Sequence, residues 1–305
     1  MSGLDWTWLW VPLTLIAGAA QVLRNGLQSN LTAKIGTLGA TQVRFIYGLP
    51  FAVLFLIAAL LIERTELPQI TRNALGWSLL GAVCQIGGTA LMLMVMGQRA
   101  FGVAYAYIKT EPVIVALLGV MLLGDHLPLL AWLAVVLVTT GVVIASVKPG
   151  EFGQLLGESR MILSGVAAGG LFGLSAIAFR GATGDLAQGD FVIRSLTVLV
   201  IAMSMQCLLL GLWLALRDRE AFTGSLREWR GSLGAGFSGA VSSAFWFAAF
   251  ALTAAANVRT LGLIELPMVA LFSGRLTGKS VARHELLGLG IVMGGVALLL
   301  AAHAA

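Results

Sequence analysis

The chain has 305 residues and a mass of 31.9 kDa; 58% of its residues are hydrophobic, only 11% are charged, and its mean hydropathy is +0.94. Soluble domains carry about 25% charged residues, because they must present polar groups to water. The composition therefore excludes a soluble enzyme, a DNA-binding domain and a disordered chain, and it indicates a polytopic helical membrane protein. The net charge of +5 is expected to face the cytoplasm and lipid headgroups rather than nucleic acid.

Long apolar stretches follow one another along the chain, separated by short connections. A bilayer core of about 30 Å needs roughly 20 helical residues, and the apolar runs lack the period-2 alternation of strands. We therefore expect an all-α membrane protein with ten transmembrane helices. The expected spans are 8–28, 41–62, 76–96, 101–123, 129–147, 161–179, 191–216, 231–253, 257–277 and 286–302.

The distribution of lysine and arginine predicts the orientation, since these residues concentrate on the cytoplasmic side. The connections after odd-numbered spans hold eleven of them: Lys34, Arg99, Lys148, Arg160, Arg217, Arg219, Arg227, Arg230, Arg275, Lys279 and Arg283. The opposite side holds three, namely Arg64, Arg72 and Arg180. Both termini are therefore expected on the periplasmic side.

The second half of the chain repeats features of the first half. Gly81-Ala82-Val83 recurs as Gly239-Ala240-Val241, and the seven-residue spacing of Pro112 and Gly119 recurs in Pro267 and Gly274. The 17-residue spacing of Gly124 and Gly141 recurs in Gly278 and Gly295. Each copy has five spans, an odd number, so the second copy must enter the membrane from the opposite side. We expect two inverted repeats, residues 1–150 and 151–305, with a binding site near the midplane at their interface.

These residues resemble the drug/metabolite transporter superfamily, specifically its EamA-type members. The resemblance rests on Ala104-Tyr105-Ala106-Tyr107 leading to Pro112, on Gly124-Asp125 before the fifth span, and on Gly141 within it. The second copy keeps Pro267, Gly278 and Gly295, but it has Lys279 where the acidic residue is expected. Within the superfamily, the chain is most similar to the bacterial aromatic amino acid exporters.

The resemblance implies a secondary transporter, not an enzyme, that exports amino acids, aromatic ones first, or related small metabolites across the bacterial inner membrane by alternating access. A drug or cation exporter, or a carrier of another metabolite, is the alternative within the same fold. Transport is expected to run downhill or to be coupled to protons. A remote alternative is an intramembrane serine protease using Ser238 in Gly236-Phe237-Ser238-Gly239, but no histidine lies within a span to serve as its base.

Ionisable residues within the spans are the first candidates for a functional site, because a charge at bilayer depth is costly unless it is paired or faces water. Lys109 and Glu111 lie in the fourth span, and Glu265 lies in the ninth, two residues before Pro267. Pro112 and Pro267 each remove a backbone donor and are expected to interrupt their helices near the site. Glu111 and Glu265 are the candidates for proton coupling. The alternative is that Lys109 pairs with Glu265 or Glu111 only to hold helices together.

Polar and aromatic residues in other spans complete the expected site. Ser238, Ser242 and Trp246 share one helix face at four-residue spacing, although Trp246 could instead serve packing. Arg24, Arg194 and Arg259 are expected to extend from span ends to the headgroups, whereas Arg44 lies next to Tyr47 in an apolar span. The expected substrate-binding residues are Gln21, Arg44, Tyr47, Gln85, Tyr105, Lys109, Ser242, Trp246 and Glu265.

No cofactor or metal is expected. The cysteines, Cys84 and Cys207, lie in apolar runs and are interpreted as small buried hydrophobic residues. Glycine strips at Gly165, Gly169 and Gly173 and at Gly290 and Gly294 predict close helix packing, with a homodimer seam as the weaker alternative. The expected partners are a small-molecule substrate and membrane lipid, with no nucleic acid, and both a monomer and a homodimer stay open.

The orientation can be tested with a C-terminal reporter that fluoresces only in the cytoplasm. The eleven-to-three asymmetry of lysine and arginine predicts a dark fusion protein that is nevertheless inserted in the membrane. The same reporter placed in the connection after the seventh span, between residues 217 and 230, should be bright. Bright fluorescence from the C-terminal fusion would overturn the orientation and leave the repeat unaffected.

Overall fold

The computed structural model describes residues 6–98, 108–147, 150, 159–266 and 282–304. These residues form helices and connections, without a strand among them. Tyr105, Pro267 and the second-copy Gly278 lie outside the described residues. A short 3-10 turn, η1 (Trp6–Trp8), is followed by α1 (Trp10–Ile46), α2 (Leu49–Glu63), α3 (Arg72–Gln98), α5 (Glu111–Leu123), α6 (Leu129–Ser146), α7 (Ser159–Asp185), α8 (Phe191–Arg217), α9 (Arg219–Arg227), α10 (Trp229–Leu252), α11 (Ala255–Gly262) and α13 (Arg283–Ala304).

Among the described residues, seven helical segments are long and apolar enough to cross a membrane. They are Asn30–Glu63, Arg72–Val95, Leu129–Ser146, Leu163–Asp185, Phe191–Arg217, Trp229–Leu252 and Arg283–Ala304. The shorter α5 is also apolar. These segments confirm an all-helical protein with several membrane-spanning helices, while the count of ten spans and the inverted repeat stay predictions.

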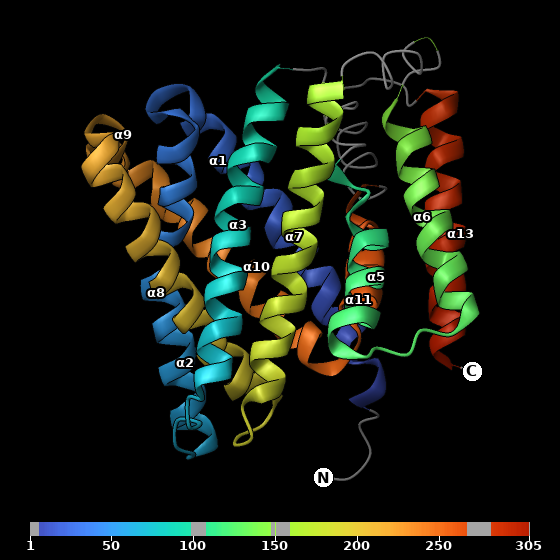
Figure 1. The fold of residues 1–305 in the computed structure, drawn as a ribbon, viewed down its shortest axis with the longest axis horizontal. Coiled ribbons are helices and arrows are strands. Elements are labelled where there is room, and N and C mark those ends of the chain that lie inside the picture. Colours follow the sequence, from blue (N-terminus) through green and yellow to red (C-terminus); the bar gives the residue numbers. More distant parts are fainter. Residues whose placement is uncertain (1–5, 99–107, 148–149, 151–158, 267–281, 305) are drawn as a thin grey trace. The chain divides into compact units, whose positions relative to one another are not determined.

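The helices assemble into two compact units. The first consists of residues 1–86 and 178–253, and the second of residues 87–177 and 254–305, so the boundaries fall inside α3 and α7. In the first unit, α1 packs along α10 and also contacts α8 and α9, while α2 packs on α8. In the second unit, α6 and α13 lie side by side and α5 packs against α11 and α6 (Figure 1). Each unit thus combines segments from both halves of the sequence.

Several expected spans are interrupted, and each described interruption comes just before a proline. Residues 41–62 do not form one helix, because α1 ends at Ile46 and α2 begins at Leu49, with Pro50 in its first turn. The fourth span has a turn at residues 109–110 before Pro112, and the ninth has a turn at residues 263–264 before Pro267. Proline favours the first turn of a helix, where its missing N–H costs no hydrogen bond, so a new helix tends to begin there.

A further kink lies within α1. Gly36 has φ 70° and ψ 172°, a backbone conformation that side-chain-bearing residues rarely adopt, and it divides α1 into two helical stretches. The sequence predicted a non-helical connection over residues 29–40, between the first two expected spans. In the structure this stretch is mostly helical, and the chain changes direction only at Gly36.

Glycines allow close helix contacts in the second unit, but not at all the expected positions. On α7, a Cβ at Gly169 would lie 2.6 Å from the carbonyl oxygen of Ile108, and one at Gly173 would lie 3.0 Å from Val115. On α13, Gly290 and Gly294 have open space around them. The packing of α13 on α6 depends on Gly288 instead, where a Cβ would lie 2.6 Å from the carbonyl oxygen of Gly141. The strip expected at Gly290 and Gly294 is therefore wrong as a packing face.

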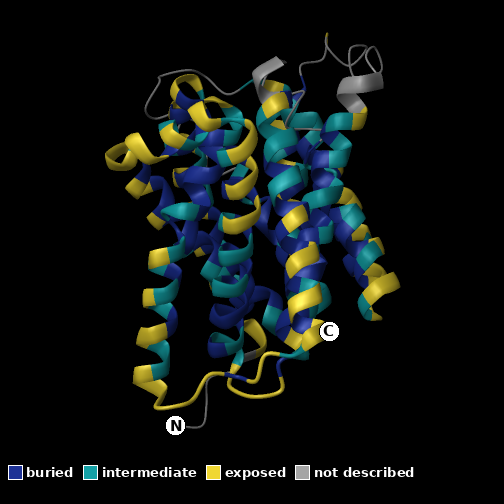
Figure 2. Ribbon diagram, turned by 60° about the vertical axis from the view of Figure 1, so that its left-hand side comes forward, coloured by how far each residue is buried: buried dark blue, intermediate teal, exposed yellow. Residues whose placement is uncertain are grey.

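Large apolar side chains remain on the outside of many helices. Exposed residues alternate with buried ones along the length of several helices (Figure 2). Ile62, Met121 and Leu129 are each more than 70% exposed. Such extensive apolar exposure is unfavourable in water and favourable against lipid chains.

The two kinds of glycine on α13 predict opposite effects of adding a methyl group. Gly288→Ala should lower the free energy of unfolding by about 1–3 kcal/mol, because its Cβ overlaps the backbone of α6. Gly290→Ala, the matched control, should be neutral or stabilising, because alanine favours a helix by about 1 kcal/mol over glycine and the site is open. Thermal melting of the purified protein in detergent measures both, and equal melting temperatures would contradict the close α6–α13 contact.

Candidate functional site

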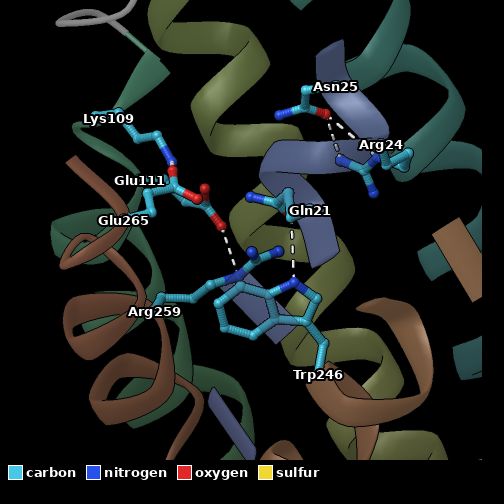
Figure 3. Close-up of polar contacts among 8 residues, drawn as sticks. All are labelled: Gln21, Arg24, Asn25, Lys109, Glu111, Trp246, Arg259 and Glu265. Carbon is cyan, nitrogen blue, oxygen red and sulfur yellow. Dashed lines mark hydrogen bonds and ion pairs between the residues drawn. The ribbon is translucent and has the colours of Figure 1, made fainter. Parts of the chain in front are cut away.

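Four charged side chains, two of them buried and two partly buried, form a cluster within the second unit. Lys109 forms an ion pair with Glu265, and the Nε of Arg259 lies 2.8 Å from Oε1 of Glu111. The side chains of all four residues are at most 13% exposed. Figure 3 shows Lys109 and Arg259 directed toward the two carboxylates. Two cations and two anions give this cluster no net charge, which is the arrangement that a low-dielectric interior favours.

The helix breaks position these four side chains. Lys109 lies in the turn that precedes α5, and Glu111 is the first residue of α5, where the positive end of the helix dipole favours a carboxylate. Arg259 lies on α11, which packs against α5, and Glu265 follows the turn that ends α11. The cluster thus joins the broken fourth and ninth expected spans at their interruptions.

Polar side chains connect α1 to α10 within the first unit. The indole N–H of Trp246 donates a hydrogen bond to Oε1 of Gln21 at 3.2 Å, as Figure 3 shows. The hydroxyl of Ser242 donates to the carbonyl oxygen of Ala17 at 2.9 Å. Trp246 also stacks on Phe250, with ring centroids 6.1 Å apart, and is only 6% exposed. The described contacts of Trp246 and Ser242 are those of helix packing.

Two arginines are buried in the same region. Arg44 donates to the hydroxyl of Ser243 at 3.5 Å, and Arg24 donates twice to Oδ1 of Asn25, at 2.8 and 3.2 Å. Their residues are only 4% and 5% exposed. The expectation that Arg24 and Arg259 extend to the headgroups is therefore wrong: Arg24 is buried in the first unit, and Arg259 pairs with Glu111 in the second.

The remaining expected site residues make contacts elsewhere in the first unit. Gln206 donates to the side-chain oxygen of Gln85 at 2.7 Å, which links α8 to α3. The hydroxyl of Tyr47 donates to the backbone carbonyls of Ser225 and Leu226, both at 3.1 Å, and so fastens the end of α1 to α9. Ser238 donates within its own helix, to Gly234 at 2.6 Å.

The first unit also contains an apolar pocket of about 380 Å³. Its lining includes Phe55, Phe191, Phe237 and Phe245, and its one polar side chain, Ser195, donates to the carbonyl oxygens of Phe191 and Phe247. None of the expected substrate-binding residues that the structure describes lines this pocket. In the part of the chain that the structure describes, no three His, Cys, Asp or Glu side chains come together as metal ligands.

Sequence reasoning missed two residues that the structure makes prominent. The sequence favours a headgroup position for Arg24 and Arg259 because each lies near the end of its expected span. Whether such an arginine turns toward the headgroups or into the protein depends on which helices pack beside it, and no local pattern in the sequence identifies those neighbours.

Comparisons with known proteins indicate the functional class to which this protein is similar. Residues 38–165, less than half of the chain, match the model of the Triose-phosphate Transporter family. Together with the apolar helices, this match supports a multi-pass membrane transporter of small metabolites within the drug/metabolite transporter superfamily. The matched family is one of transporters, not enzymes. The EamA-type assignment and the closeness to aromatic amino acid exporters stay predictions.

The fold itself has a solved counterpart. A protein of known crystal structure is similar to this chain with a TM-score of 0.70, over 95% of this chain and 98% of its own, at 17% sequence identity. At this identity the likeness shows the fold alone. Among curated proteins, no sequence matches this chain.

The buried Lys109–Glu265 pair predicts a specific pattern of stability changes. Lys109→Met should lower the free energy of unfolding by about 3–5 kcal/mol, because it removes the cation from a buried carboxylate. The double variant Lys109→Met/Glu265→Gln should recover most of this loss. The matched control is Lys34→Met, which breaks an exposed pair with Glu228 and should cost less than about 1 kcal/mol. If Lys109→Met and Lys34→Met melt at the same temperature, the pair does not stabilise the fold.

Proposed function

We propose that this chain is a secondary transporter that carries small charged metabolites across the bacterial inner membrane by alternating access. The observation that carries the proposal is the buried ion pair of Lys109 and Glu265, located where two expected spans are interrupted. Buried charges at helix breaks are characteristic of transporter binding sites, since the interrupted backbone also offers unpaired polar groups to a ligand. A pair serving only as helix glue does not require the interruptions.

Binding would proceed by an exchange of partners. The ammonium group of a substrate displaces Lys109 from Glu265, while Lys109 turns to the carboxylate of the substrate. Every charge then keeps a counterion throughout binding, as a low-dielectric site demands. Glu111, held by Arg259, is the second candidate for proton coupling.

The inverted repeat is part of the proposal. The fourth and ninth expected spans meet through α5 and α11, and the fifth and tenth meet through α6 and α13. Each of these contacts joins corresponding elements of the proposed copies, residues 1–150 and 151–305. Two intertwined copies of opposite orientation would give the two similar half-structures that alternating access requires.

Amino acids, aromatic ones first, are the proposed cargo. Their two charged groups match the partner exchange at Lys109 and Glu265, and the resemblance to EamA-type exporters supports export as the direction. Gln85 and Trp246 make the helix contacts described above, and their role in substrate binding stays a prediction from the sequence, as does that of Tyr105. A cationic drug suits the site less well, because both buried carboxylates, Glu111 and Glu265, already have a basic partner.

A phosphorylated metabolite is the second candidate cargo. The match to the Triose-phosphate Transporter family favours it, as do the additional buried cations Arg24 and Arg259. Such a cargo would bind through its phosphate and would not need Glu265 as an ammonium partner.

The proposed exchange predicts that Glu265→Gln abolishes transport or impairs it severely while folded protein remains in the membrane. The measurement is efflux from liposomes of labelled phenylalanine, leucine and 3-phosphoglycerate, each with and without a pH gradient. Glu228→Gln, which removes an exposed carboxylate from the first unit, is the matched control and should transport normally. Normal transport by Glu265→Gln at every pH would falsify the exchange mechanism and assign the pair to structure. Efflux of the phosphorylated compound alone would favour the second candidate.

A further inference from the structure

The apolar pocket of the first unit begins just beyond a close contact of α10 with the turn between α1 and α2. A Cβ at Gly236 would lie 2.6 Å from the carbonyl carbon of Tyr47, so backbone meets backbone at this point. One residue later, the ring of Phe237 meets the rings of Phe51 and Phe55 edge to face, with centroids 5.2 and 6.4 Å away. The lining of α10 then continues to Ala248, so the pocket occupies the space beyond this contact, among α2, α8 and α10 (Figure 1).

The walls of the pocket are suited to an apolar ligand. Among the described residues that line it, Ser195 has the only polar side chain, and its hydroxyl donates to the carbonyl oxygens of Phe191 and Phe247. Sites for polar metabolites combine apolar walls with a few polar groups that fix the orientation of the ligand. The described lining supplies no such group, so an occupant must bind through an apolar part of its structure.

The pocket is continuous with the surface that faces lipid. Phe237 lines the pocket and is also 48% exposed, and Leu54 and Ile57 on α2 and Leu233 on α10 are exposed as well. The helices α2, α8 and α10 all belong to segments that are long and apolar enough to cross a membrane. Such segments are surrounded by the hydrocarbon chains of the bilayer. The molecules at the mouth of the pocket are therefore acyl chains.

We infer that this pocket binds an acyl chain of a membrane phospholipid. Its volume of about 380 Å³ lies within the range of small-molecule sites, about 300–1,000 Å³. An empty pocket would leave its walls without dispersion contacts, and water cannot replace them where it finds no polar partners. A flexible methylene chain restores these contacts and needs no polar group from the wall. The site lies within the first unit and does not involve Lys109 or Glu265, so the inference does not depend on the proposed function.

The test is photolabelling of the purified full-length protein in detergent by a phosphatidylcholine that carries a diazirine at the end of one acyl chain. Irradiation, proteolysis and mass spectrometry then locate the label. Labelling of the peptides that contain Phe55 and Phe237 should saturate as the lipid concentration rises, and unlabelled phosphatidylcholine should displace it. The exposed residues Leu286, Leu287 and Met293 of α13 provide the reference for general contact with lipid, and their labelling should rise in proportion to the lipid concentration.

Filling the pocket should remove the saturable labelling. Ala244→Phe adds a ring to the wall and should lower this labelling by about tenfold or more, because excluding even two methylenes from an apolar site costs about that factor in affinity. The matched control is Ala301→Phe, which adds the same ring at an exposed position of α13 and should be labelled like the unmodified protein. Where Ala244→Phe does not fold, Val241→Phe fills the pocket from one turn earlier in α10.

Three outcomes would overturn the inference. The first is labelling near Phe55 and Phe237 that rises in proportion to the lipid concentration, as it does on α13. The second is saturable labelling that persists in the folded variant with a filled pocket. The third is displacement of the label by phenylalanine or 3-phosphoglycerate but not by unlabelled phosphatidylcholine, which would assign the pocket to a transported metabolite.

Discussion

Burying charge in a low-dielectric interior is the constraint on which the rest of this structure depends. The chain has few charged residues, yet Lys109, Glu111, Arg259 and Glu265 are buried within one unit and Arg24 and Arg44 within the other. The first group satisfies the constraint internally, with as many anions as cations. In the second group, Arg24 donates to Asn25 and Arg44 donates to Ser243. Both groups therefore keep their charges hydrogen-bonded or paired within the protein, as a low-dielectric interior demands.

Prolines determine where these charges can lie. The interruptions before Pro50, Pro112 and Pro267 convert what would be continuous spans into shorter helices with free ends. A helix start offers N–H groups and the positive end of a dipole, which is why Glu111 is stable as the first residue of α5. The same free ends would be costly against lipid, so they must lie within the protein, where they can meet a ligand.

The sequence predicted what depends on composition and local chemistry, but not what depends on which helices meet. Helical spans follow from apolar length, and Lys109 and Glu265 stood out because each is charged within such a span. The partner of Glu111 could not be foreseen, because Arg259 reaches it through the packing of α11 on α5. Gly290 and Gly294 have helical spacing yet do not pack, because the rotation of α13 about its axis turns Gly288 toward α6. Pro50 indicates a helix start within the second expected span, and an assignment of spans from apolar length alone overlooks it.

The contact of α6 with α13 limits how this protein can move. A Cβ added at Gly141 or Gly288 would lie within 2.8 Å of backbone atoms of the facing helix, and one at Gly295 would lie 3.0 Å from the backbone nitrogen of Val138, so the two backbones are in close contact along this seam. Helices separated by flexible side chains can slide or roll against each other. Two helices in close backbone contact are instead expected to move together as one rigid body. If the protein transports by the proposed mechanism, its rearrangement is therefore expected at the broken helices, with the α6–α13 contact kept intact.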